Sequence, residues 1–201
     1  MKYQIYTPCS GIEYRIKLSK EFINNTSISI QYRYRSKTGN TPNPDNRIST
    51  TDDKELQNLY FHLQHQSNDN LIFNSRIALS KYSTINNIDT VGFLMYQEII
   101  YTPVSLPLSI AARYTIFQAD DYNSRIYTYE RDLVYEFSTP AFYGKGSKFY
   151  ILATFNISNR TSIGIKYSWL YYPEKTTIGS NADMIEGKHK QEFKIQLRSN
   201  F

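Results

Sequence analysis

Apolar and polar side chains alternate along this chain in segments of about ten residues. In residues 11–20 (GIEYRIKLSK) the even positions are Ile, Tyr, Ile and Leu, and the odd positions between them are Glu, Arg and Lys. Residues 26–37 and 161–171 alternate in the same way. Because successive side chains of a β-strand point to opposite faces, each segment is predicted to be a strand with one apolar and one polar face. Further strands are predicted at 56–66, 71–81, 91–101, 108–118, 147–157 and 190–201.

The lengths of these strands and of their connections indicate a membrane barrel. A strand of ten or eleven residues is longer than is usual in globular proteins and suffices to cross a bilayer at a tilt. Short and long connections alternate, which is typical of transmembrane barrels with tight periplasmic turns and longer outer loops. The short connections are 22–26, 67–70, 102–107 and 158–160, and the long ones are 37–54, 82–90, 119–146 and 172–189.

The predicted fold class is therefore an all-β, antiparallel, up-and-down transmembrane β-barrel that forms one domain over residues 1–201. The segments above give nine strands, whereas bacterial single-chain barrels have even numbers. Two alternatives restore an even count: about ten strands with a stunted first strand at 2–6 (KYQIY), or a chain that is the C-terminal part of a larger barrel. Residues 119–146 are interpreted as a long outer loop with its own hairpin, or as strand extensions above the membrane.

The aromatic content favours strands but leaves a soluble alternative open. The 201 residues include nineteen Tyr, eleven Phe and one Trp, and the mean hydropathy is -0.53. In a barrel, outward aromatic residues near the strand ends form girdles at the membrane interface. In a lipocalin-like or β-sandwich protein that binds an apolar ligand, the same residues would fill the core. These residues are Tyr32, Tyr34, Tyr114, Tyr167, Trp169 and Tyr171.

Basic residues accumulate on the polar face of the strands. Lys and Arg outnumber Asp and Glu by 23 to 18, which gives a net charge of +5. A barrel wall of this sign would attract an anionic solute. Alternatively, the bases pair with Glu13, Glu192, loop acids and one another through water, and so plug a narrow barrel. The residues predicted to line the lumen are Arg15, Arg33, Arg35, Arg76, Arg113, Lys166, Lys194 and Arg198.

The sequence contains no convincing catalytic, cofactor or metal signature. His62 and His65 are three residues apart and hence on opposite faces of one strand, so they cannot converge on a metal. The single Cys9 offers no cysteine pair, and GKGSK (144–148) lacks the spacing of a phosphate-binding loop. We therefore predict a non-enzymatic protein without a cofactor, which acts as a membrane scaffold, channel or translocation component.

Two strings carry a resemblance to a known family: SRIYTYERDLVYEFSTPAFYGKGSKFYI (124–151) and TIGSNADMIEGKHKQEFKIQLRSNF (177–201). They resemble the C-terminal barrel region of Bacteroidota outer-membrane proteins that carry an N-terminal helix-hairpin-helix module. The resemblance implies an outer-membrane location, contact with outer-membrane lipid, and assembly by the outer-membrane insertion machinery. The module that suggests DNA contact in that family has no counterpart here, so a nucleic-acid partner is doubtful.

The last strand is predicted to close the barrel and to face lipid with its odd positions. Its apolar residues alternate with polar ones to the end of the chain. The alternation predicts only the strand, whereas the resemblance implies that the insertion machinery reads it as an assembly signal. The residues of this predicted signal are Phe193, Ile195, Leu197 and Phe201.

Overall fold

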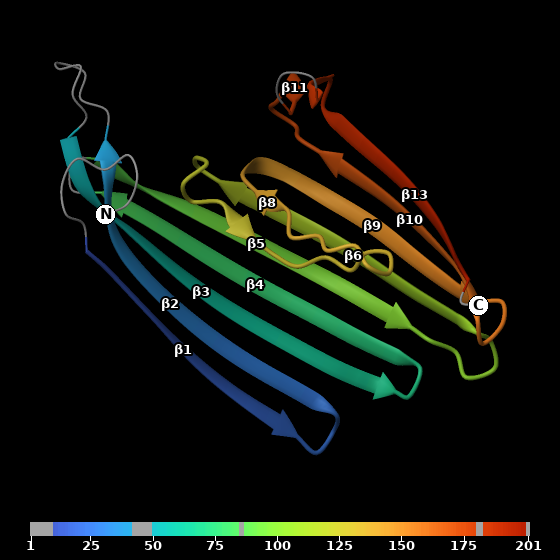
Figure 1. Cartoon of the computed structure of the whole chain (residues 1–201). Helices are drawn as coiled ribbons and strands as arrows, with labels where there is room; N and C mark the ends of the chain where they lie inside the picture. The colour runs from blue at the N-terminus through green and yellow to red at the C-terminus, as the bar shows by residue number, and fades with distance from the viewer. Residues whose placement is uncertain (1–9, 42–49, 85–86, 180–182, 200–201) are drawn as a thin grey trace.

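The computed structural model describes residues 10–41, 50–84, 87–179 and 183–199, which fold into one large antiparallel sheet (Figure 1). The sheet has nine strands in the order β1-β2-β3-β4-β5-β6-β9-β10-β13. Every strand pairs with its neighbours in chain order, apart from short hairpins within two connections. This architecture confirms the predicted all-β, up-and-down fold class. In the described residues, no helix is long and apolar enough to cross a membrane.

All nine strands of the large sheet are longer than an average globular strand. The strands of the large sheet are β1 (Gly11–Phe22), β2 (Thr26–Thr41), β3 (Thr50–Asn68), β4 (Leu71–Thr84), β5 (Asn87–Tyr101), β6 (Leu108–Ala119), β9 (Gly144–Asn156), β10 (Thr161–Tyr171) and β13 (His189–Ser199). Two small hairpins are formed by β7 (Ile126–Tyr127) with β8 (Ala141–Phe142), and by β11 (Thr177–Ile178) with β12 (Ile185–Glu186).

Two predicted loops prove to be largely strand. The β2–β3 ladder continues to the pair Thr41↔Thr50, within the predicted loop 37–54. The predicted loop 82–90 is wrong, because β4 and β5 stay paired through a register shift as far as Thr84↔Asn87. These polar segments lack an apolar face, but the backbone ladder still pairs their N–H and C=O groups. The prediction mistook polar strand ends for loops.

The two edge strands run in the same direction, because the first and the ninth strand of an antiparallel sheet have the same polarity. In Figure 1 the arrows of β1 and β13 both point towards the end of the sheet that carries the short turns. The described residues of β1 and β13 do not pair with each other. Antiparallel closure of the barrel would therefore take an odd number of further strands. The predicted short strand at 2–6 lies outside the described residues.

The alternation separates an apolar outer face from an inner face that carries the core. Leu18 and Ile195 on the outer face are 69% and 66% exposed. The buried hydrophobic cluster lies on the opposite face, where Leu94, Tyr96 and Phe117 pack with residues of the connections. The soluble alternative would bury the outward aromatic residues, but Tyr114 is 51% exposed. The outward tyrosines therefore form no core in this structure.

Residues 120–143 fold back over the inner face of the sheet, and we call them the infolded segment. They contain the predicted hairpin, but the segment is not above the sheet as an outer loop or strand extension would be. In Figure 1 it crosses in front of β5 and β6, and β7 lies against β4 and β5. A Cβ atom on Gly92 would clash with the carbonyl oxygen of Ser124, so β5 and the infolded segment can approach closely only at a glycine.

Candidate functional site on the inner face

The infolded segment begins at a tight turn that directs the chain onto the sheet. Just after β6, the Asp121 carboxylate accepts hydrogen bonds from the backbone N–H groups of Asn123 and Ser124 at 2.9 and 3.0 Å. Asp side chains favour such turns because they replace a backbone acceptor. Burial favours the neutral acid, but these hydrogen bonds and one from Thr90 outweigh it and hold the pKa of Asp121 below its ordinary value.

The segment divides the inner face into two regions. The covered half is the inner face of β5, β6, β9, β10 and β13, over which residues 120–143 lie. The open half is the inner face of β1 to β4. By strand register, all eight basic residues predicted to line the lumen share the inner face, with Arg15, Arg33, Arg35 and Arg76 in the open half and Arg113, Lys166, Lys194 and Arg198 on strands of the covered half.

A buried ion pair lies at the centre of the covered half. Glu98 on β5 and Arg113 on β6 are cross-strand partners, and Arg113 Nη2 lies 2.7 Å from Glu98 Oε1. Each side chain is only 3% exposed. Tyr150 and Asn74 donate to the same carboxylate at 2.7 and 2.9 Å. Such a buried pair is stable only when its remaining donors and acceptors are also satisfied, as they are around Glu98.

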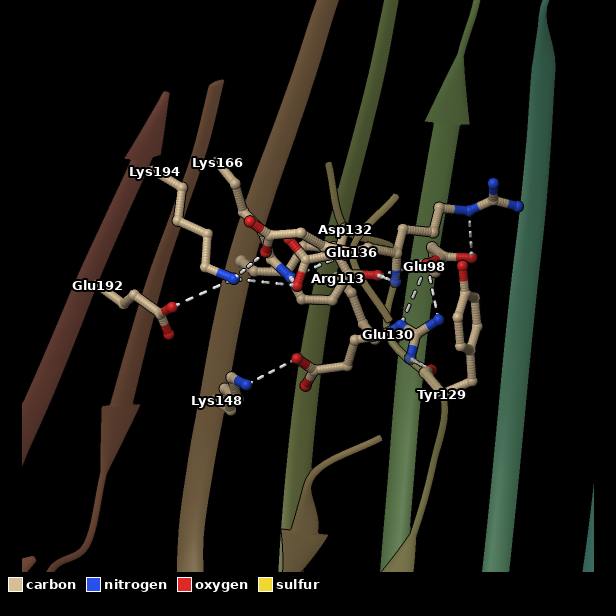
Figure 2. Close-up of polar contacts among 12 residues, drawn as sticks. Glu98, Arg113, Tyr129, Glu130, Asp132, Glu136, Lys148, Lys166, Glu192 and Lys194 are labelled. Carbon is tan, nitrogen blue, oxygen red and sulfur yellow. Dashed lines mark hydrogen bonds and ion pairs between the residues drawn. The ribbon is translucent and has the colours of Figure 1, made fainter. Parts of the chain in front are cut away.

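Arg113 also fastens the infolded segment to the sheet. Its Nη1 donates to the carbonyl oxygen of Tyr129 at 2.6 Å (Figure 2). Its guanidinium lies 3.9 Å from the ring centroid of Tyr96, a cation–π contact in a desolvated site. One side chain thus joins β5, β6 and residue 129, and so positions the segment along the inner face.

Acids of the infolded segment pair with three further bases of the covered half, Lys148, Lys166 and Lys194. Asp132 Oδ2 accepts from Lys166 at 2.8 Å and lies 3.4 Å from Lys194 Nζ. Lys194 also pairs with Glu136 and Glu192 (Figure 2). A further pair, with 2.6 Å between the charged atoms, joins Lys148 on β9 to Glu130.

The pKa of Asp132 reflects this environment. Burial alone would raise it, but the hydrogen bonds from Lys166 and from the backbone N–H of Leu133, with the positive charge of both lysines, hold the pKa below its ordinary value. Asp132 is therefore a carboxylate at neutral pH and links the segment to β10 and β13. Lys166 and Lys194 pair with acids of the infolded segment, and Lys194 also with Glu192, whereas Arg113 pairs with Glu98 of β5.

The open half has a different electrostatic character. Its closest ion pair joins Arg33 Nη2 to Glu13 Oε1 at 2.8 Å, and both side chains are partly exposed. Beside it lies a cavity of about 460 Å³, which we call the basic pocket. Among the described residues that line this pocket there is no carboxylate. Its five basic side chains are Arg33, Arg35, Lys37, Lys54 and Arg125.

The residues that sequence reasoning missed include Glu98 and Tyr150 in the covered half and Arg125 and Tyr127 beside the open half. Glu98 did give a signal, since it is the only charged residue among the inward positions of the strand 91–101. Arg125 and Tyr127 gave none, because they belong to a segment that was placed outside the barrel.

The other predicted features are placed as follows. The described residues contain no group of three or more His, Cys, Asp or Glu side chains that could hold a metal ion. His62 faces inward beside Arg76, whereas His65 lies on the other face, 2.9 Å from the hydroxyl of Thr26. Phe193, Ile195 and Leu197 are exposed on the outer face, and Phe201 lies outside the described residues.

Comparison with solved structures relates the fold to porins. An anion-selective porin from Comamonas acidovorans superposes with a TM-score of 0.51 at 10% sequence identity, over 93% of this chain and 59% of the porin. A NanC porin matches with a TM-score of 0.44 at 12% identity, over 96% of each chain. No protein-family model and no curated protein sequence matches the chain. The first similarity shows that the chain has a porin-type β-barrel fold and spans 59% of that porin's length.

Proposed function

We propose that this protein is an outer-membrane β-barrel channel that conducts small anionic solutes past the open half of its inner face. The observation that carries the proposal is the separation of side chains by face. Apolar residues are exposed along the whole outer face, from Ile16 on β1 to Leu197 on β13, and bases occupy the open half of the inner face.

Each face suits a different medium. Burying exposed apolar surface in lipid is favourable, and a barrel pairs its backbone groups within the sheet. The inner face carries charges that lipid would not tolerate but a water-filled lumen would solvate. In this proposal the outer face contacts outer-membrane lipid, and the chain reaches the membrane through the outer-membrane insertion machinery.

The two halves would divide the work of the channel. In the covered half, the infolded segment lies over the inner surface and its acids pair with Lys148, Lys166 and Lys194 of the strands. In the open half, Arg15, Arg35 and Arg76 remain on the wall with few carboxylates nearby. A wall of one sign raises the local concentration of counter-ions, so anions should pass more readily than cations.

The test is the reversal potential of the purified protein in a planar bilayer under a KCl gradient. The wild-type protein should prefer Cl⁻, and Arg35→Glu should move the reversal potential towards that of a cation-selective channel. Arg160→Glu is the matched control, because Arg160 lies in the exposed turn between β9 and β10 and undergoes the same change of charge. A protein that gives no conductance, or whose selectivity changes equally in both variants, would contradict the proposal.

A further inference from the structure

We infer that the basic pocket is a binding site for a ring-shaped solute with at least two anionic groups, such as phosphates, sulfates or carboxylates. The inference rests on the proposed function, because the pocket belongs to the same inner face. It goes further by assigning a discrete site and a class of solute, where the channel proposal requires only a diffuse positive charge.

Strands β2 and β3 supply four of the cations at a fixed spacing. Arg33, Arg35 and Lys37 occupy successive inward positions of β2, and Lys54 of β3 is the cross-strand partner of Lys37. Successive inward positions of a strand are about 7 Å apart, so like charges at these positions repel one another. A solute with two or more negative groups would offset this repulsion and could contact two or three bases at once.

The fifth cation, Arg125, comes from the infolded segment and is held by neutral groups. Its Nε donates to the hydroxyl of Tyr127 at 2.7 Å, and its Nη1 donates to the carbonyl oxygen of Tyr122. Its guanidinium lies 4.0 Å from the ring centroid of Tyr122. Within the described residues, Arg125 pairs with no carboxylate, so these contacts fix its position and leave its charge uncompensated. Such a preorganised base loses little entropy when an anion binds.

The nearest acids offset only part of the charge of the pocket. Glu13 pairs with Arg33 but is not among the residues that line the cavity. Asp52 also points inward, as the cross-strand partner of Gly39, yet it lies outside the lining as well. The contrast with the covered half is direct, since Lys166 and Lys194 are each within 3.4 Å of a carboxylate oxygen. For Arg35 and Arg125, to which the described residues give no carboxylate partner, an external anion can therefore supply the negative charge.

Three tyrosines favour a ring over a flexible chain. Tyr60, Tyr82 and Tyr127 line the pocket beside the bases. Aromatic side chains give a flat surface on which a ring can stack, and their hydroxyls can hydrogen-bond to its substituents. A cavity of about 460 Å³ falls within the range of sites for small molecules, and so suits one or two rings.

The site can be tested by block of the channel current in planar bilayers. The probes are benzene-1,3,5-tricarboxylate, fructose 1,6-bisphosphate and propane-1,2,3-tricarboxylate; the last matches the first in carboxylate groups but has no ring. Both ring probes should block at lower concentrations than the open-chain tricarboxylate. If only one ring probe blocks at a lower concentration, the result identifies which type of ring, aromatic or sugar, the site binds. Equal block by all three would overturn the assignment of a ring-shaped ligand.

Variants then distinguish a site from a diffuse field. Arg125→Gln should raise the half-blocking concentration of the ring probes about tenfold or more, since a charged hydrogen bond is lost. Arg125→Lys should recover part of that loss. Arg198→Gln, which removes one inward charge outside the pocket, should change the half-blocking concentration little. If Arg198→Gln weakens block as much as Arg125→Gln, there is no discrete site, although anion selectivity and the proposed function stand.

Equilibrium binding tests the site in the basic pocket independently of the proposed channel. Titration calorimetry of the detergent-solubilised protein with benzene-1,3,5-tricarboxylate should show saturable binding that Arg125→Gln weakens. If binding is found but the bilayer shows no conductance, the site is supported and the channel is not. If the probes neither bind nor block while the channel conducts anions, the site is refuted.

Discussion

The two halves of the inner face are built from the same strand pattern but differ in what neutralises their bases. In the covered half, Arg113 and Lys166 are buried and paired with carboxylates from β5 and the infolded segment. In the open half, Arg35 is exposed and faces a pocket whose described lining has no carboxylate. An inward basic residue thus stabilises the fold on one side and is available to a solute on the other. What distinguishes the two roles is the chain segment that packs against each base.

The largest effect should come from breaking the central pair of the covered half. Glu98→Ala leaves the Arg113 guanidinium buried without its main partner, which should cost about 3–5 kcal/mol of unfolding free energy. The matched change in the open half, Glu13→Ala, removes the partner of Arg33 at a partly exposed site and should cost less than about 1 kcal/mol. Guanidinium unfolding in detergent micelles measures both values. Similar losses in the two variants would remove the distinction between the halves.

Outward substitutions should have similar effects behind the open half and behind the covered half. Ile30 on β2 and Ile165 on β10 lie behind the open and the covered half, respectively, and both are exposed outward. Ile30→Arg and Ile165→Arg should each cost about 2–4 kcal/mol near the bilayer midplane. Arg33→Glu, which alters an inward position, should leave membrane insertion intact. Folding into lipid vesicles at increasing denaturant checks this, and equal tolerance of outward and inward changes would refute the assignment of the faces.

Acid should loosen the covered half before the open half. The pKa of Asp132 is held below its ordinary value of 3.8, so its stabilising contribution is complete above that pH and is lost as the pH falls through the lower value in the folded state. Hydrogen exchange of the infolded segment should therefore speed up below about pH 4, relative to that of β2 and β3.

The variant Asp132→Asn separates this carboxylate from its neighbours. It removes the titrating group next to Lys166 and Lys194, so the segment should exchange faster already at neutral pH and respond less to acid. An unchanged acid response in this variant would transfer the effect to Glu130 or Glu136, the other acids of the segment that pair with lysines of the strands.

The sequence allowed the two faces of the strands to be predicted, but not the position of the infolded segment over the inner face. Alternation is a local property, and it placed Arg33 and Ile30 on opposite faces correctly. The contact between Arg113 and the carbonyl oxygen of Tyr129 depends on the tertiary path of the chain. A polar connection that extends outside the membrane and one that folds back into the lumen have the same kind of sequence. For the same reason Arg125 was absent from the predicted lumen.

The polar strand ends show a related limit. At Thr84 and Asn87, the backbone ladder holds the strands together where no apolar face signals a strand. Lumen lining by the eight predicted bases, the family resemblance, and the assembly signal that includes Phe201 stay predictions.

The central claim, that the apolar outer face meets lipid, can be tested with the single tryptophan of the chain. Trp169 lies on the outward phase of β10, where its ring stacks on Tyr171 with a centroid separation of 5.7 Å. Its fluorescence is measured after reconstitution into vesicles whose lipids carry bromine on the acyl chains near the headgroups. The account predicts strong quenching by these lipids and little quenching by aqueous iodide. Efficient iodide quenching with no effect of the brominated lipids would place the outer face in water and contradict the account.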